Sequence, residues 1–117
     1  KVTVLTVSEP LRAEVIEAAR RGGLEDPTAH YDRQIDAMMK ERFAFIEERA
    51  EEHGVAVDLL HEVDRSPAEA IVRSAEARGC DLIVMSSHGR RGMRKVLLGS
   101  QTSEVLVHTT IPVLVIR

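Results

Sequence analysis

Residues 81–117 read DLIVMSSHGRRGMRKVLLGSQTSEVLVHTTIPVLVIR, and this stretch decides the fold. Its first apolar run, 82–85, predicts a buried strand and passes directly into a small, polar and basic loop, 86–91. A second small-residue turn, Gly99-Ser100, comes before a short helical pattern, and the last apolar run, 111–116, predicts another strand. Turns that follow a strand and open a helix are where an α/β protein offers backbone N–H groups to an anion. The stretch therefore suggests a phosphate site.

The rest of the chain alternates between strand and helix patterns. Polar, turn-forming residues predict a loop over 22–31. Strands that alternate with helices and are apolar on both faces indicate parallel crossovers, and hence a three-layer α/β/α sandwich. A chain of 117 residues is long enough for one such core, so we expect a single domain over 1–117. We expect the remaining strands at 2–7 and 55–63, and the helices at 11–21, 32–53, 67–78 and 100–108.

Two of these helices carry specific local patterns. Ser66 as N-cap, Pro67 at the first helical position and Glu69 shortly after them predict a capping box. The long helix at 32–53 carries Met and Phe side chains on one stripe. Such a stripe can line a ligand pocket, but a face that packs on the core is the more common role of these residues. We therefore expect these residues of both helices to stabilise the fold and not to bind a ligand.

Composition excludes several classes of protein. A hydrophobic fraction of 44% and a charged fraction of 30% are ordinary for a soluble globular domain, and no apolar run is long enough to enter and cross a membrane. The first residues show no signal-peptide pattern, and the single cysteine, Cys80, cannot form an internal disulfide. We therefore expect a cytoplasmic protein in which Cys80 is a small buried side chain. The net charge of -3 and the scarcity of aromatic residues give no reason to expect nucleic acid binding.

The basic loop and the Gly99-Ser100 turn carry the chemistry of the suggested site. Gly89 lacks a Cβ and can take positive φ, which lets a phosphate approach the backbone. The Ser100 hydroxyl can cap the last helix, bond a phosphate oxygen or alternate between the two roles. Similar turns occur in α/β domains that bind nothing, so both interpretations stay open at this point. The most basic part of the chain comprises Arg90, Arg91, Arg94 and Lys95.

The pattern does not predict an efficient enzyme. No Gly-Lys-Ser or Gly-Lys-Thr follows the strand, which argues against phosphoryl transfer of the P-loop type. His88 is a candidate general base, but a lone histidine beside two arginines more often faces a ligand or solvent. The other histidines have neither metal-ligand spacing nor cysteine companions, so we expect no metal site. Slow hydrolysis of a bound ligand is the most that this residue set favours.

These residues resemble the signature of the universal stress protein family. That signature is Gly-x-x-Gly, nine residues, then Gly-Ser or Gly-Thr. Here Ser86-Ser87-His88-Gly89 is followed by 90–98 and then by Gly99-Ser100. The flanking segments 80–85 and 111–117 are also similar to the family, and 2–7 is similar to its second strand. The resemblance covers nearly the whole chain.

The resemblance implies a fold, an assembly and a ligand. The implied fold is a five-stranded parallel sheet of order 3-2-1-4-5, and the implied assembly is a homodimer joined through the last strand at 111–116. One subfamily has bound ATP, so the resemblance implies ATP as the ligand of this chain, with AMP or ADP as alternatives. In that subfamily Val7 matches a position near the adenine. The loop over ribose and phosphates matches Met85, Ser86, Gly89 and Arg90, and the second phosphate turn matches Gly99, Ser100, Gln101 and Thr102.

Two departures from the family pattern matter. Ser86 stands where the first glycine of the signature usually lies, and its Cβ is unfavourable if φ is positive or if the ligand presses on that backbone. We expect this change to weaken ATP binding without abolishing it. The family's first strand and helix have no counterpart before Lys1, and without that central strand we expect open edges on the two halves of the sheet. A second hypothesis is therefore a protein-interaction module without nucleotide, whose basic loop meets an acidic partner such as a transporter or kinase domain.

Overall fold

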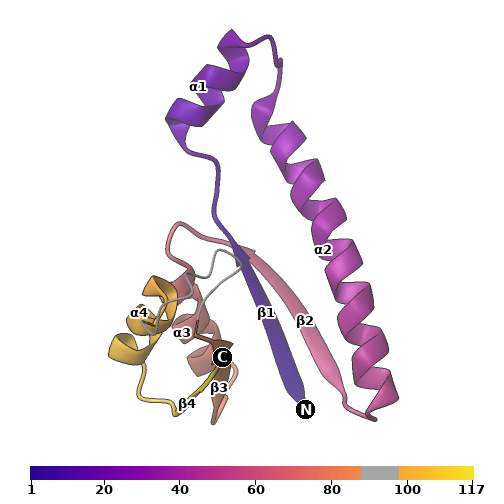
Figure 1. Ribbon diagram of the computed structural model, residues 1–117, viewed down its shortest axis with the longest axis vertical. Coiled ribbons are helices and arrows are strands. Elements are labelled where there is room, and N and C mark those ends of the chain that lie inside the picture. Colours follow the sequence, from indigo (N-terminus) through magenta and orange to yellow (C-terminus); the bar gives the residue numbers. More distant parts are fainter. Residues whose placement is uncertain (88–97) are drawn as a thin grey trace. The chain divides into compact units, whose positions relative to one another are not determined.

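Parallel strands and helices alternate along the chain (Figure 1). The structure is a computed structural model that describes residues 1–87 and 98–117. The chain divides into two units, Lys1–Arg65 and Ser66–Arg117. The expected α/β class with parallel strands is confirmed. In chain order the elements are β1 (Val2–Ser8), α1 (Ala13–Arg21), α2 (Pro27–Glu52), β2 (Val57–Val63), α3 (Pro67–Ala77), β3 (Ile83–Ser86), α4 (Ser100–His108) and β4 (Val113–Ile116).

The first unit is built on a parallel pair of strands. β1 and β2 stay in register along their whole length, as when Val4 lies opposite Leu59. At the carboxyl end of the pair, Ser8 Oγ lies 2.8 Å from His61 Nε2. The predicted strand at 55–63 is confirmed, but it begins at Val57 because the Val55 N–H still donates to a carbonyl in the last turn of α2.

The structure corrects the predicted loop over 22–31, because α2 begins inside it. Asp26 is the N-cap of α2, and its Oδ1 accepts a hydrogen bond from Ala29 N at 3.1 Å. Pro27 then occupies the first helical position, where a missing N–H costs no helical hydrogen bond. The result is one helix of 26 residues.

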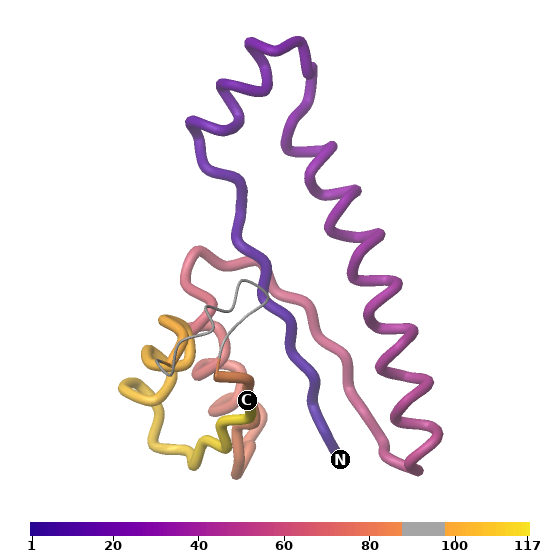
Figure 2. Tube along the Cα trace, viewed as in Figure 1, coloured from indigo at the N-terminus to yellow at the C-terminus, as the bar shows by residue number. Residues whose placement is uncertain are grey.

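α2 runs back from the turn after α1 and contacts β2 (Figures 1 and 2). Near its start, the Tyr31 hydroxyl donates to the Glu9 carbonyl at 2.6 Å, which ties the helix to the segment after β1. Met39 is buried, and the other apolar residues of its stripe are half-buried: Ile35, Phe43, Ile46 and Ala50. The core-facing interpretation of this stripe is confirmed.

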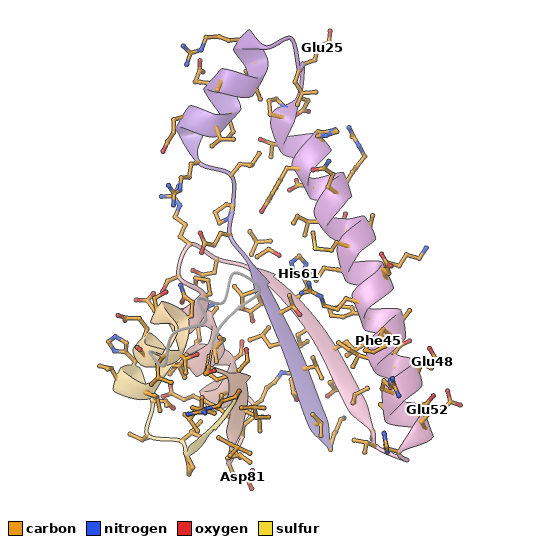
Figure 3. The ribbon with its side chains drawn as sticks, viewed as in Figure 1. Glu25, Phe45, Glu48, Glu52, His61 and Asp81 are labelled. Carbon is orange, nitrogen blue, oxygen red and sulfur yellow. The ribbon has the colours of Figure 1, made fainter. Side chains whose placement is uncertain are left out.

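The carboxyl part of α2 carries an exposed aromatic side chain (Figure 3). Phe45 is 58% exposed, and the Arg49 guanidinium carbon lies 5.4 Å from its ring centroid. Arg49 Nη1 also lies 3.3 Å from Glu52 Oε2, so the cation interacts with both neighbours on its own helix.

The second unit has its own apolar core, to which α3, β3 and α4 all contribute. Val105 of α4 is completely buried at its centre. One face of the β3–β4 pair is partly exposed, because Val84 and Leu114 on that face are 53% and 52% exposed. Cys80, expected to be a small buried side chain, is half-buried against this core. The buried residues of the core are Ala68, Val72, Ala75, Ile83 and Val105.

The start of α3 confirms one part of the predicted cap and corrects another. Ser66 is the N-cap and Pro67 follows it, as predicted. The Ser66 side chain makes no capping hydrogen bond, so the predicted capping box is wrong. The Gln101 side chain of α4 takes its place, since Gln101 Oε1 accepts from Ala68 N at 3.1 Å. The other end of the helix is closed by Gly79, whose φ of +65° favours glycine.

Sheet pairing agrees with part of the implied strand order. β1 pairs with β2 and β3 pairs with β4, both parallel, and each sheet has two strands among the described residues. If strand 1 of the order 3-2-1-4-5 is left out, β1 to β4 correspond to strands 2 to 5. The order then contains the same two pairs, 3-2 and 4-5. The last strand is shorter than the predicted 111–116, because β4 begins at Val113, after Pro112.

Candidate functional site

Hydrogen bonds join the carboxyl end of β3 to the start of α4. Gly99 N donates to Ser87 O at 2.6 Å. Thr102 Oγ1 donates to Ser86 O at 2.8 Å. Because residues 88–98 connect these two elements in the chain, the bonds bring both ends of that segment together. The β3 end and the Gly99-Ser100 turn are therefore neighbours, as the sequence suggests.

The first turn of α4 presents bare backbone N–H groups. Gly99 is the N-cap, with φ −60° and ψ 154°, and it provides no side-chain cap. The helical hydrogen bonds begin where Ser103 N donates to Gly99 O at 3.0 Å. Within residues 1–87 and 98–117, the N–H groups of Ser100, Gln101 and Thr102 have no acceptor. Such groups carry the positive end of the helix dipole and favour an anion.

The structure changes the role expected of Ser100. Because Gly99 is the N-cap, Ser100 is the first helical residue, so of the roles left open for its hydroxyl the structure excludes N-capping of α4. Its side chain is exposed and makes no hydrogen bond with any of the described residues. The hydroxyl is thus available to a ligand beside the bare N–H groups.

Gln101 and Thr102 differ from Ser100 in what their side chains contact. Thr102 is only 3% exposed, and its hydroxyl is bonded to β3. The Gln101 side chain is exposed, but its oxygen is bonded to the start of α3. Both residues therefore connect α4 to other parts of the second unit.

The residues of the β3 end have distinct environments. Met85 is half-buried, lies opposite Val115 and packs against the core of the second unit. Ser86 is exposed at the last position of β3. All positive φ values among the described residues belong to glycines, so φ of Ser86 is not positive. A Cβ at this position therefore causes no left-handed strain of the backbone.

The other residues expected at the site belong to the first unit or to the basic loop. Val7 belongs to the first unit, where it is half-buried near the end of β1 and opposite Glu62. The basic loop, with His88, Gly89 and Arg90, lies outside the described residues. Ser87 was missed by sequence reasoning. It contributes its backbone carbonyl, a role that no side-chain pattern could have indicated.

The structure gives limited support to acid–base chemistry. The Ser8–His61 contact has the distance of a nucleophile with its base, but His61 has no second hydrogen bond among the described residues that would orient its ring. His108 lies 3.1 Å from Glu104 on the exposed side of α4, which is a local helix pair. In the part of the chain that the structure describes, His, Cys, Asp and Glu side chains form no group able to hold a metal ion. None of the helices described is both long and apolar enough to span a membrane.

Comparison with known proteins shows which family this chain resembles. The model of the universal stress protein family matches residues 1–117. Universal stress protein YxiE of Bacillus subtilis is 30% identical over 110 residues, which cover 91% of this chain and 74% of YxiE. Universal stress protein MJ0577 of Methanocaldococcus jannaschii is 45% identical over 51 residues, which cover 44% of this chain and 32% of MJ0577.

A solved structure of MJ0577 agrees over a longer part of the chain. It matches with a TM-score of 0.77 and 28% identity, over 99% of this chain and 74% of the MJ0577 chain. Universal stress protein MJ0531 of the same archaeon is 39% identical over 74 residues, which cover 62% of this chain and 42% of MJ0531. In sequence, the matched segments thus span less than half of these two archaeal relatives. Because the family model matches every residue from 1 to 117, the chain belongs to the universal stress protein family.

Proposed function

We propose that this chain binds ATP, with ADP and AMP as alternatives, and acts as a stress-response signalling module. The observation that carries the proposal is the first turn of α4, where three N–H groups that have no acceptor among the described residues lie beside the exposed Ser100 hydroxyl. These donors occur where the family signature has its second phosphate turn. An anionic phosphate chain is the ligand that such a helix start favours.

The proposed division of roles along the nucleotide follows from the chemistry of each segment. The turn at Gly99 and Ser100 binds phosphate oxygens through backbone N–H groups and a hydroxyl. Ser86 and Met85, with Gly89 and Arg90 of the basic loop, cover the ribose and the phosphates. Val7 supplies apolar contact to the adenine, as the family resemblance implies.

Nucleotide binding is tested first by asking what the purified protein carries. The full-length protein is denatured, and the supernatant is analysed by anion-exchange chromatography. A peak of ATP, ADP or AMP near one per chain supports the proposal. An empty protein that also fails to bind millimolar ATP contradicts it.

A substitution at the turn makes this test specific. In Gly99→Asp, a carboxylate at the N-cap accepts hydrogen bonds from the N–H groups of the first turn and repels phosphate. Because aspartate is a good N-cap, we expect α4 to remain folded while ATP binding is lost. Retention of full affinity in a folded Gly99→Asp variant would place the phosphate elsewhere.

We further propose that the chain forms a homodimer through β4. Leu114 and Ile116 are 52% and 50% exposed on this strand, and β4 pairs with only one strand among the described residues. An apolar strand edge of this kind favours pairing with a second copy. In Leu114→Lys we expect monomers in sedimentation velocity experiments, because Leu114 is exposed on this strand; a dimer that persists would move the interface elsewhere.

The alternative is a protein-interaction module without nucleotide. The exposed Ser86, in the place of a signature glycine, is the observation that favours it. Under this alternative, Gly99→Asp leaves capture of the partner unchanged and the wild-type protein binds no ATP. Loss of partner capture together with ATP binding would argue for the nucleotide-dependent function.

A further inference from the structure

Two neighbouring side chains of α4 brace its first turn against different elements. Thr102 Oγ1 donates to Ser86 O of β3 at 2.8 Å. Gln101 Oε1 accepts from Ala68 N at 3.1 Å, at the start of α3. The first turn of α4 is thereby fixed both to the end of β3 and to α3.

The environments of these side chains argue against direct ligand contact by their bonded atoms. Thr102 is 97% buried, given an exposed fraction of 3%, and the single proton of its hydroxyl is already donated to β3. The Gln101 oxygen likewise has a partner, because it accepts from an N–H group at the start of α3. Ser100 is different, since its side chain is exposed and makes no hydrogen bond with any described residue.

We propose that Thr102 and Gln101 are positioning residues, which hold the bare N–H groups of α4 in the arrangement that a phosphate chain requires. This inference rests on the proposed nucleotide binding and assigns a role within it. Fixed donors bind an anion more tightly than mobile ones, because their ordering cost is met before the ligand arrives. The two side chains therefore act on phosphate affinity through the backbone.

The test compares ATP with adenosine, the nucleoside that lacks the phosphate chain. Dissociation constants for ATP and for adenosine are measured on the full-length protein by isothermal titration calorimetry. Thr102→Val keeps the shape of the side chain and removes its hydroxyl. We expect it to weaken ATP binding by roughly five- to tenfold, the effect of losing about one hydrogen bond, and to leave adenosine binding unchanged. Thr102→Ser keeps the hydroxyl, and we expect it to restore ATP affinity.

A matched control is available at the other end of the same helix. The Thr109 hydroxyl accepts from Ile111 N at 3.0 Å, so Thr109→Val also removes one side-chain hydrogen bond to the backbone. We expect its ATP affinity to equal that of the wild type. Gln101→Met removes the second brace at an exposed position, so it tests the proposal even if Thr102→Val does not fold. We expect it to weaken ATP selectively too.

The outcomes separate this inference from the proposed function. Unchanged ATP affinity in both Thr102→Val and Gln101→Met, with wild-type protein that binds ATP, overturns the positioning role and leaves nucleotide binding standing. Equal weakening of ATP and adenosine, or an equal effect in Thr109→Val, overturns it as well, because the effect is then a general loss of structure. Wild-type protein that binds no ATP overturns both proposals.

Discussion

Truncation of Val105 is the sharpest test of how the second unit holds α4 in place. Val105 has no exposed surface and lies in the core formed by α3, β3 and α4. Val105→Ala removes carbon equivalent to two methylene groups, which corresponds to about 1.6 kcal/mol of lost burial. The cavity that remains adds to this loss, so we expect the free energy of unfolding to fall by about 2–3 kcal/mol.

The measurement is urea unfolding followed by circular dichroism, with a control on the same helix. Val107 is 77% exposed, so Val107→Ala makes the same chemical change without opening a cavity. We expect Val107→Ala to change the free energy of unfolding by less than about 0.5 kcal/mol. The urea dependence should be similar in all three proteins, which shows that the comparison concerns stability. Losses of equal size in the two variants would refute the placement of Val105 at the centre of this core.

Three further substitutions test local features of the two units, all by the same urea unfolding assay. Asp26→Ala removes the N-cap of α2 and should cost about 1 kcal/mol, whereas Asp26→Asn should retain most of the stability; equal losses would exclude the cap. Gly79→Ala should cost about 1–2 kcal/mol from backbone strain alone, because φ is +65° and no atom lies within 4 Å of the added Cβ; a neutral effect would contradict this φ. Tyr31→Phe should cost about 0.5–1 kcal/mol through loss of the hydrogen bond to Glu9, and a stabilising effect would argue against that bond.

The elements of this protein are largely predictable from local sequence. Apolar spacing predicts all four strands and all four helices of the described chain, with errors mainly at their ends. The start of α2 was missed although its signal, Asp26-Pro27, is the same kind of N-cap and proline pair that correctly marked Ser66-Pro67. The polar composition of 22–31 outweighed that signal. The local sequence therefore contained the signal for the start of α2, and the error was to give polar composition more weight than the N-cap and proline pair.

The candidate site is predictable only in part. The sequence correctly placed Gly99-Ser100 at the start of the last helix, because backbone donors at a helix start depend on local chain geometry. Of the roles that the sequence left open for the Ser100 hydroxyl, the structure excludes N-capping, because Gly99 is the N-cap. Sequence spacing could not distinguish the exposed Ser100 from the buried Thr102, since burial depends on what packs against the helix.

The sequence by itself determined the parallel α/β pattern, the family signature and the position of the Gly99-Ser100 turn, because these follow from short-range periodicity and turn chemistry. The tertiary structure alone decided which side chains brace that turn. Gln101 caps α3 across a separation of 33 residues, in place of the neighbouring Ser66. Thr102 reaches the end of β3 across 16 residues. Such bonds form only once distant elements have packed, because a side chain bonds the groups that the fold brings within reach.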